Sequence, residues 1–167
     1  DCLLSRGLGD VYKRQQLQRI VIRIREKGSF PSGDARLNRD FVPILDKIHD
    51  VLLNTGGKIA VAGHTDNVPI STPRYRSNWE LSTSRATSVV HEFLKTGEIE
   101  ADRFVLEGYA ETQPLMPNDT SKNRAKNRRV EIIVLKSAVK AELTRSIEQL
   151  NKDYDSVEGR ITDVERQ

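Results

Sequence analysis

The stretch Lys58-Ile59-Ala60-Val61-Ala62-Gly63-His64-Thr65-Asp66-Asn67 decides the fold, because a short apolar run ends there in a polar loop. The continuous run at 59–62 predicts a central strand buried on both faces. Gly63 follows directly and lets another part of the backbone approach closely. Because α/β sheets gather functional groups beyond the carboxyl ends of such strands, we expect a site near His64 and Asp66.

The segments on either side show the periodicities of a small α/β domain. Ile20, Ile22 and Ile24 alternate with less apolar residues, as in a strand with one buried face. We expect the strand at 59–62 to run parallel to this first strand, because a helix connects them. The predicted elements in order are a strand at 20–25, a helix capped by Asn38 and stopped by Gly56-Gly57, the strand at 59–62, a helix at 78–96, a strand at 104–109, a polar connection at 112–126 and a strand at 130–135.

Composition sets the protein class. The chain has 167 residues, 37% of them hydrophobic and 31% charged, which suits one globular domain with polar extensions. A formal charge of +3 is far from the dense basicity of a protein that lives on nucleic acid. No run approaches the roughly 18 apolar residues that cross a bilayer, and no stretch has the charged start and long apolar middle expected of a signal peptide. The single Cys2 allows no internal disulfide, which fits the cytosol or a Cys-poor periplasmic protein.

The chain divides into three parts. Residues 1–15 lack helical or strand periodicity and look like a foreign or disordered segment, and we expect the folded domain at 16–136. Residues 137–167 carry apolar side chains at steps of four or three residues, the seam of a heptad helix. This helix either packs on its own domain or forms a coiled coil with a second copy, and the spacing favours neither.

Several chemistries are disfavoured by the residues themselves. His64 and Asp66 could begin a metal site, but no third ligand follows at a suitable spacing, and a hydrogen-bonded His beside a strand end is the simpler interpretation. Ser82 and Ser84 lack a Gly-x-Ser-x-Gly elbow, and their place at a helix start suggests capping. Glu80 suits the first turn of the same helix. We therefore expect no catalysis, metal or cofactor.

A binding role for one acid and one base is better supported. Asp66 can accept hydrogen bonds from an ammonium group, and Arg85 can grip a carboxylate through two parallel bonds, so the pair matches a small zwitterion. The alternative is a plain ion pair between them that stiffens the loop. The basic residues at 122–129 are interpreted as a solvated loop, because no aromatic residues interleave with them to stack nucleic acid bases.

Five blocks in order carry a family resemblance: Gly-His-Thr-Asp at 63–66, Asn78, Leu-Ser-x-x-Arg-Ala at 81–86, Gly-Tyr at 108–109 and Asn-Arg-Arg-Val-Glu at 127–131. They resemble the OmpA-like C-terminal domain, a periplasmic peptidoglycan-binding module, over residues 20–135. Within it, Asp-Asn-Val-Pro-Ile at 66–70 and Ser-Asn-Trp-Glu-Leu-Ser at 77–82 are most similar to flagellar motor stator subunits of the MotB type. The resemblance implies an α+β sandwich of βαβαββ type with a mixed four-stranded sheet and helices on one face.

The resemblance also implies a ligand and a setting. It places Asp66 and Arg85 on the diaminopimelate side chain of the peptidoglycan stem peptide, with Thr65, Asn78, Leu81 and Arg128 lining the pocket and the 30–34 turn nearby. Asn127 is as much a candidate for bonding loop backbone as for a contact. The implied protein is a non-enzymatic periplasmic anchor, a homodimer tied to the inner membrane and its stator partners by an N-terminal helix absent here. The alternatives are an outer-membrane or secretion-system tether and, less favoured, a peptidoglycan hydrolase or a nucleic-acid-binding module.

Overall fold

The computed structural model describes residues 19–135 and Gln149. The segment 1–15 and, apart from Gln149, the predicted heptad helix at 137–167 lie outside the described residues. Within the described part of the chain, no helix has the length and apolar character needed to cross a membrane.

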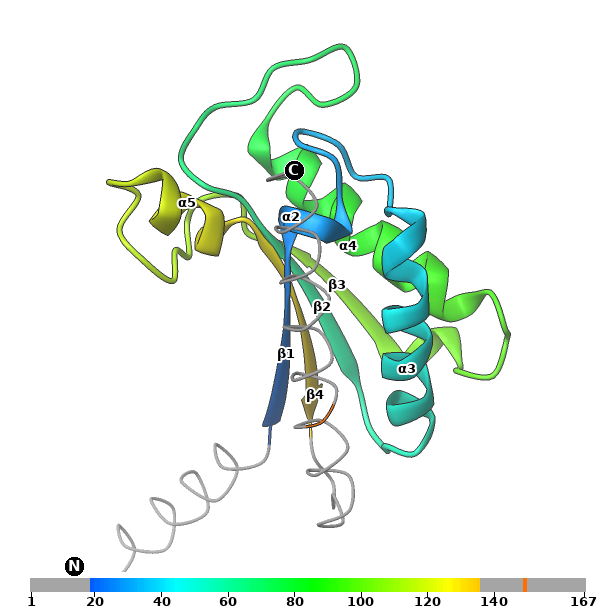
Figure 1. The fold of residues 1–167 in the computed structure, drawn as a ribbon. Helices are drawn as coiled ribbons and strands as arrows, with labels where there is room; N and C mark the ends of the chain where they lie inside the picture. The colour runs from blue at the N-terminus through cyan, green and yellow to red at the C-terminus, as the bar shows by residue number, and fades with distance from the viewer. Residues whose placement is uncertain (1–18, 136–148, 150–167) are drawn as a thin grey trace, which may run out of the picture.

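The described elements form one four-stranded sheet with two long helices packed on it (Figure 1). In chain order they are β1 (Arg19–Arg25), the short α2 (Glu26–Ser29), η1 (Arg39–Phe41), α3 (Val42–Leu53), β2 (Ile59–His64), α4 (Asn78–Leu94), η2 (Ala101–Arg103), β3 (Phe104–Gly108), α5 (Ser121–Asn127) and β4 (Arg129–Leu135). This arrangement confirms the predicted mixed sheet with helices on one face.

The strand order is β1-β4-β2-β3. β4 runs antiparallel to both of its neighbours, and β2 pairs in parallel with the edge strand β3. β1 and β2 therefore point in the same direction, as predicted from the helix between them, but β4 separates them. Two consequences of this register matter below: Arg25 lies opposite Arg129, and the carboxyl end of β2 lies beside the start of β4.

The main core lies between the sheet and helices α3 and α4. Alternate residues of β1 point into it, since Ile22 and Ile24 are buried and Ile20 packs at its margin. The Phe93 ring of α4 stacks on Phe104 of β3, with centroids 6.1 Å apart. The remaining buried members of the core include Leu45, Ile48 and Leu52 of α3, Ile59 and Val61 of β2, Val89 and Val90 of α4, and Val130, Ile132 and Val134 of β4.

The ends of the helices differ from the predictions. Asn38 does not cap α3: its amide donates to the Gly28 carbonyl at 2.9 Å, and α3 begins only at Val42, after a turn of 3₁₀ helix. The helix also ends at Leu53, before the glycine pair. In α4 the cap is Ser77, so the predicted capping role of Ser82 is wrong, and its hydroxyl donates within the helix to the Trp79 carbonyl.

The connection at 112–126 contains α5, which the sequence did not predict. The helix is short and polar, with Asn127 as its only buried residue, so it lacks the apolar periodicity that marks longer helices. Thr120 caps it through a hydrogen bond accepted from the Asn123 backbone N–H at 3.1 Å. Asn127 bonds loop backbone, which settles its two interpretations: its amide oxygen accepts from the N–H groups of Leu115 and Met116, both at 2.9 Å.

Gly63 confirms its predicted role as a point of close approach. A Cβ atom at this position would collide with the Ser82 carbonyl group of α4. The contact fixes the end of β2 against the second turn of α4. Asp66 lies in the loop that follows β2, and Arg85 lies on α4.

Candidate functional site

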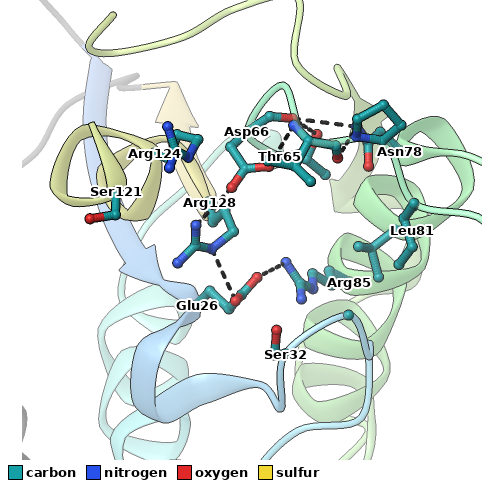
Figure 2. A pocket seen from close by; sticks show the side chains of 14 residues that line it. Glu26, Ser32, Thr65, Asp66, Asn78, Leu81, Arg85, Ser121, Arg124 and Arg128 are labelled. Atoms are coloured by element: carbon teal, nitrogen blue, oxygen red, sulfur yellow. Dashed lines mark hydrogen bonds and ion pairs between the residues drawn. The ribbon is translucent and has the colours of Figure 1, made fainter. Parts of the chain in front are cut away.

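A cavity of about 410 Å³ opens where β2 ends, between α2, the start of α4 and α5 (Figure 2). All the residues predicted to bind ligand line it, so the structure brings together segments from four separate blocks of sequence. Its lining consists of Glu26, Ser32, Gly33, Thr65, Asp66, Val68, Pro69, Ile70, Asn78, Leu81, Arg85, Ser121, Arg124 and Arg128.

Asp66 is buried and held by the loop that follows β2. Its Oδ1 accepts a hydrogen bond from the Val68 N–H at 3.0 Å, and its Oδ2 accepts from Nη1 of Arg128 at 2.7 Å. Thr65 fixes the backbone beside it, because its N–H donates to the Ala110 carbonyl at 2.8 Å and its hydroxyl donates to the Asp66 carbonyl at 2.9 Å. A carboxylate has about four acceptor positions, so Asp66 retains capacity for a further donor.

Arg85 is only 1% exposed, yet it is a charged residue facing this cavity. Its Nε donates to the Asp34 carbonyl at 2.8 Å, and its Nη1 lies 2.5 Å from Oε2 of Glu26. The guanidinium also lies over the Phe30 ring, 5.3 Å from the centroid. Nη2 is buried and has no hydrogen-bond partner among the described residues. An unsatisfied buried donor of this kind is costly and marks a place for an acceptor.

The predicted alternative, an ion pair between Asp66 and Arg85, is wrong. Glu26 stands between the two halves of the site, since its Oε2 meets Arg85 and its Oε1 accepts from Nε of Arg128 at 3.0 Å (Figure 2). The charges therefore alternate along a chain from Asp66 through Arg128 and Glu26 to Arg85. Burial alone would lower the pKa of Arg128, but the bond to Asp66 and the charge of Glu26 outweigh it and raise that pKa.

Glu26 did not emerge from the sequence as a site residue. It lies 102 positions from Arg128 along the chain, and the two meet because β1 and β4 pair. The Glu26 N–H donates to the Arg128 carbonyl at 3.0 Å, which continues the strand ladder beyond the pair Arg25–Arg129. In the sequence Glu26 is only an acid directly after the first strand. That position indicates a site residue only when the register between the first and last strands is known.

Asn78 and Leu81 shape the cavity from α4. The Asn78 amide donates to the Val68 carbonyl at 3.1 Å and to Oε2 of Glu111 at 3.3 Å, so it ties the loop after β2 to the helix. Leu81 is buried in a small apolar cluster with Tyr75 and Ala35, against which Ile70 packs. Both residues therefore have structural partners in addition to their place in the lining.

The basic residues predicted as one solvated cluster separate into different environments. Arg128 points into the cavity, and Arg124 lines its rim while donating to the Asn118 carbonyl at 3.1 Å. Arg129 alternates to the opposite face of the sheet, where its Nε donates to Oε1 of Glu131 at 2.8 Å. The alternation of β4 explains why neighbouring arginines do not share a surface.

His64 also lies away from the cavity. It is 2% exposed, and its ring stacks on Tyr109 with centroids 5.2 Å apart. Neither ring nitrogen has a hydrogen-bond partner among the described residues, so the predicted hydrogen-bonded histidine is wrong. Burial, with the nearby charge of Arg129, lowers its pKa to about 4, which keeps the ring neutral at pH 7. Within residues 19–135, no three His, Cys, Asp or Glu side chains cluster as metal ligands would.

Comparison with known proteins shows the family of the chain. Residues 29–128 match the model of the OmpA family. Motility protein B of Bacillus subtilis is 36% identical over 117 residues, which cover 70% of this chain and 45% of that protein. The chain thus spans less than half of the length of that relative.

Solved structures show the same fold. The cell wall anchor of the T6SS from Pseudomonas aeruginosa aligns with a TM-score of 0.68 and 40% identity, over 80% of this chain and 97% of that one. The periplasmic domain of Helicobacter pylori MotB aligns with a TM-score of 0.66 and 27% identity, over 78% of this chain and 84% of that one.

Proposed function

Because the chain belongs to the OmpA family, we propose that it binds peptidoglycan without covalent chemistry and anchors an envelope assembly to the cell wall. A cell wall anchor and a motility protein are both similar to it over most of its length. Within this proposal the protein works by recognition alone, in the periplasm. A peptidoglycan hydrolase is the less favoured alternative, because both acids that line the cavity, Glu26 and Asp66, are bonded to Arg128.

The ligand we propose is the diaminopimelate side chain of the stem peptide, whose free end carries an ammonium and a carboxylate. The observation that carries this proposal is the buried, unpartnered Nη2 of Arg85 in the same cavity as Asp66. Asp66 would accept the ammonium, and Nη2 would donate to the carboxylate. Because Nε of Arg85 donates to the Asp34 carbonyl and Nη1 contacts Glu26, Nη2 is the nitrogen of this guanidinium that has no partner and would meet the carboxylate.

The other predicted residues have supporting roles in this proposal. Arg128 holds the Asp66 carboxylate at 2.7 Å, while Thr65 and Asn78 fix the loop that carries it. Leu81 provides apolar surface for the methylene groups of the ligand. Binding therefore depends on Asp66 and Arg85 for charge recognition and on these neighbours for geometry.

For the assembly we propose a flagellar motor stator of the MotB type, acting as a homodimer tied to the inner membrane by a segment outside this domain. Similarity to motility protein B supports this choice. Similarity to the T6SS anchor supports the alternative of a secretion-system tether that uses the same module. Both assemblies need the same contact with the cell wall.

The test is co-sedimentation with purified sacculi and competition by a soluble muropeptide bearing diaminopimelate. We expect Asp66→Asn and Arg85→Gln each to weaken binding at least about tenfold, because each removes a charge-assisted hydrogen bond worth roughly 1.5–3 kcal/mol. Asp102→Asn is the matched control, since that acid is 82% exposed beside β3, at the far end of the sheet. Circular dichroism melts establish that the variants are folded.

Wild-type affinity in folded Asp66→Asn and Arg85→Gln would refute the proposed ligand contacts. Incubating sacculi with the wild-type chain separates binding from hydrolysis. Release of soluble muropeptides over time would show that the protein is an enzyme and would refute the recognition-only function.

A further inference from the structure

Glu26 places a second carboxylate in the proposed site, between the two arginines. Its side chain is 11% exposed and contacts both Arg85, at 2.5 Å, and Arg128, at 3.0 Å. The buried Arg85 and the partly exposed Arg128 are thereby paired with two carboxylates, those of Glu26 and Asp66. Arg124 lies at the rim, where its guanidinium donates to the Asn118 carbonyl. Removing one partner from a group of paired charges leaves an uncompensated buried charge. The pairing of opposite charges therefore stabilises the arrangement of side chains around the cavity.

This balance determines which ligand charge the cavity tolerates. Without Glu26 the remaining groups would carry a surplus positive charge, and a lone carboxylate would be attracted to Arg85 and Arg128 together. With Glu26 in place, a lone carboxylate at Nη2 of Arg85 approaches a like charge bonded to the adjacent nitrogen Nη1. A lone ammonium at Asp66 is opposed by Arg128, which is bonded to the same carboxylate. Only a group that brings both charges leaves the balance unchanged.

We propose that Glu26 is a specificity-determining residue that makes this site select a zwitterionic group over a singly charged one. The inference rests on the proposed function and deepens it, because it predicts that the free diaminopimelate end binds better than a form with either charge masked. Glu26 acts by positioning Arg85 and Arg128 and by its own charge, without having to touch the ligand.

Three muropeptides that differ only at the diaminopimelate end test the proposal. One is unmodified, one has the side-chain amine acetylated and so carries only the carboxylate, and one has the carboxylate amidated and carries only the ammonium. Isothermal titration of the wild-type chain at low salt is expected to rank the unmodified form first. Equal or tighter binding of either masked form would overturn the proposal.

The variant Glu26→Gln keeps the size of the side chain and removes its charge. We expect the preference for the unmodified form over the acetylated form to fall by about tenfold, as the loss of one charge several ångströms away implies in a partly buried site. The preference over the amidated form should rise, because the carboxylate loses its like-charged neighbour. A merely structural role would weaken all three ligands in parallel, and that result would refute the selectivity role.

Two further variants complete the test. Glu26→Asp keeps the charge and should keep the wild-type ranking of the three muropeptides even if all affinities fall. This variant tests the proposal if Glu26→Gln does not fold. A changed ranking in Glu26→Asp would count against the proposal. Glu100→Gln makes the same change in net charge at an exposed position before the start of β3, at the opposite end of the sheet, and should leave the ranking unchanged. If the wild type binds none of the muropeptides, the proposed function itself fails; if it binds but Glu26→Gln shifts nothing, only the role of Glu26 fails.

Discussion

Gly63→Ala is the sharpest test of how the fold builds the site. The added Cβ would overlap the Ser82 carbonyl of α4, and neither partner is a flexible side-chain end that can move aside. β2 and α4 must therefore separate. Overpacking against a rigid neighbour costs about 3 kcal/mol, the upper part of the usual range. The apparent Tm should fall by roughly 4 °C for each kcal/mol, so by about 12 °C in total.

The matched control is Gly97→Ala, after α4. That position has a φ of 71° but nothing within 4 Å of an added Cβ, so the substitution meets conformational strain without a clash. We expect a loss of about 1 kcal/mol. Urea unfolding followed by circular dichroism measures both variants. Equal destabilisation of the two, or a loss below about 1 kcal/mol for Gly63→Ala, would refute the claim that steric contact with Ser82 fixes this spacing.

Gly63→Ala should also weaken ligand binding. Asp66 follows Gly63 by three residues and Arg85 follows Ser82 by three, so widening this contact separates the two proposed charge partners. The folded fraction of Gly63→Ala should bind muropeptide more weakly than the folded fraction of Gly97→Ala. Unchanged affinity would show that the loops, and not the strand–helix contact, set the geometry of the cavity.

Other substitutions test separate parts of the structure by urea unfolding. Asn127→Ala should cost about 2–3 kcal/mol, because it leaves the N–H groups of the 115–116 loop without their acceptor. The pKa of His64 is about 4 in the folded chain, below its ordinary value of 6.5, so the unfolded chain takes up the proton first. The free energy of unfolding therefore falls as the pH drops from 6.5 towards 4. His64→Phe should remove about 2 kcal/mol of the loss between pH 7 and pH 5, and an identical pH dependence would refute the burial argument. Phe93→Ala, at 1% exposure, should cost about 3–5 kcal/mol, whereas Trp79→Ala, at 51% exposure, should cost less than about 1 kcal/mol.

Local sequence patterns were enough to predict the elements that have a buried face. The alternation of Ile20, Ile22 and Ile24 and the apolar run at 59–62 predicted β1 and β2 correctly, because a strand must place its apolar residues towards the core. α5 escaped prediction because its stability comes from a cap and from Asn127, not from an apolar stripe. The end of α3 was misjudged because the glycine pair lies beyond the residue where the helix stops.

The sequence by itself indicated six residues of the cavity lining. Asp66, Arg85, Thr65, Asn78, Leu81 and Arg128 were all indicated by motif blocks, and all line one cavity in the structure. Their role in binding stays a prediction. The blocks lie just after β2, in the first half of α4 and just before β4, where short-range patterns locate them well.

Only the tertiary structure decided how these charges are connected. Asp66 pairs with Arg128 and Arg85 pairs with Glu26, whereas residue types alone suggested a direct contact between Asp66 and Arg85. The reason is the register of β4 between β1 and β2, which sets Glu26 beside Arg128 across 102 positions of chain. Strand order depends on long-range packing and leaves no local trace in the sequence, so the charge balance of the cavity becomes visible only when the sheet is assembled.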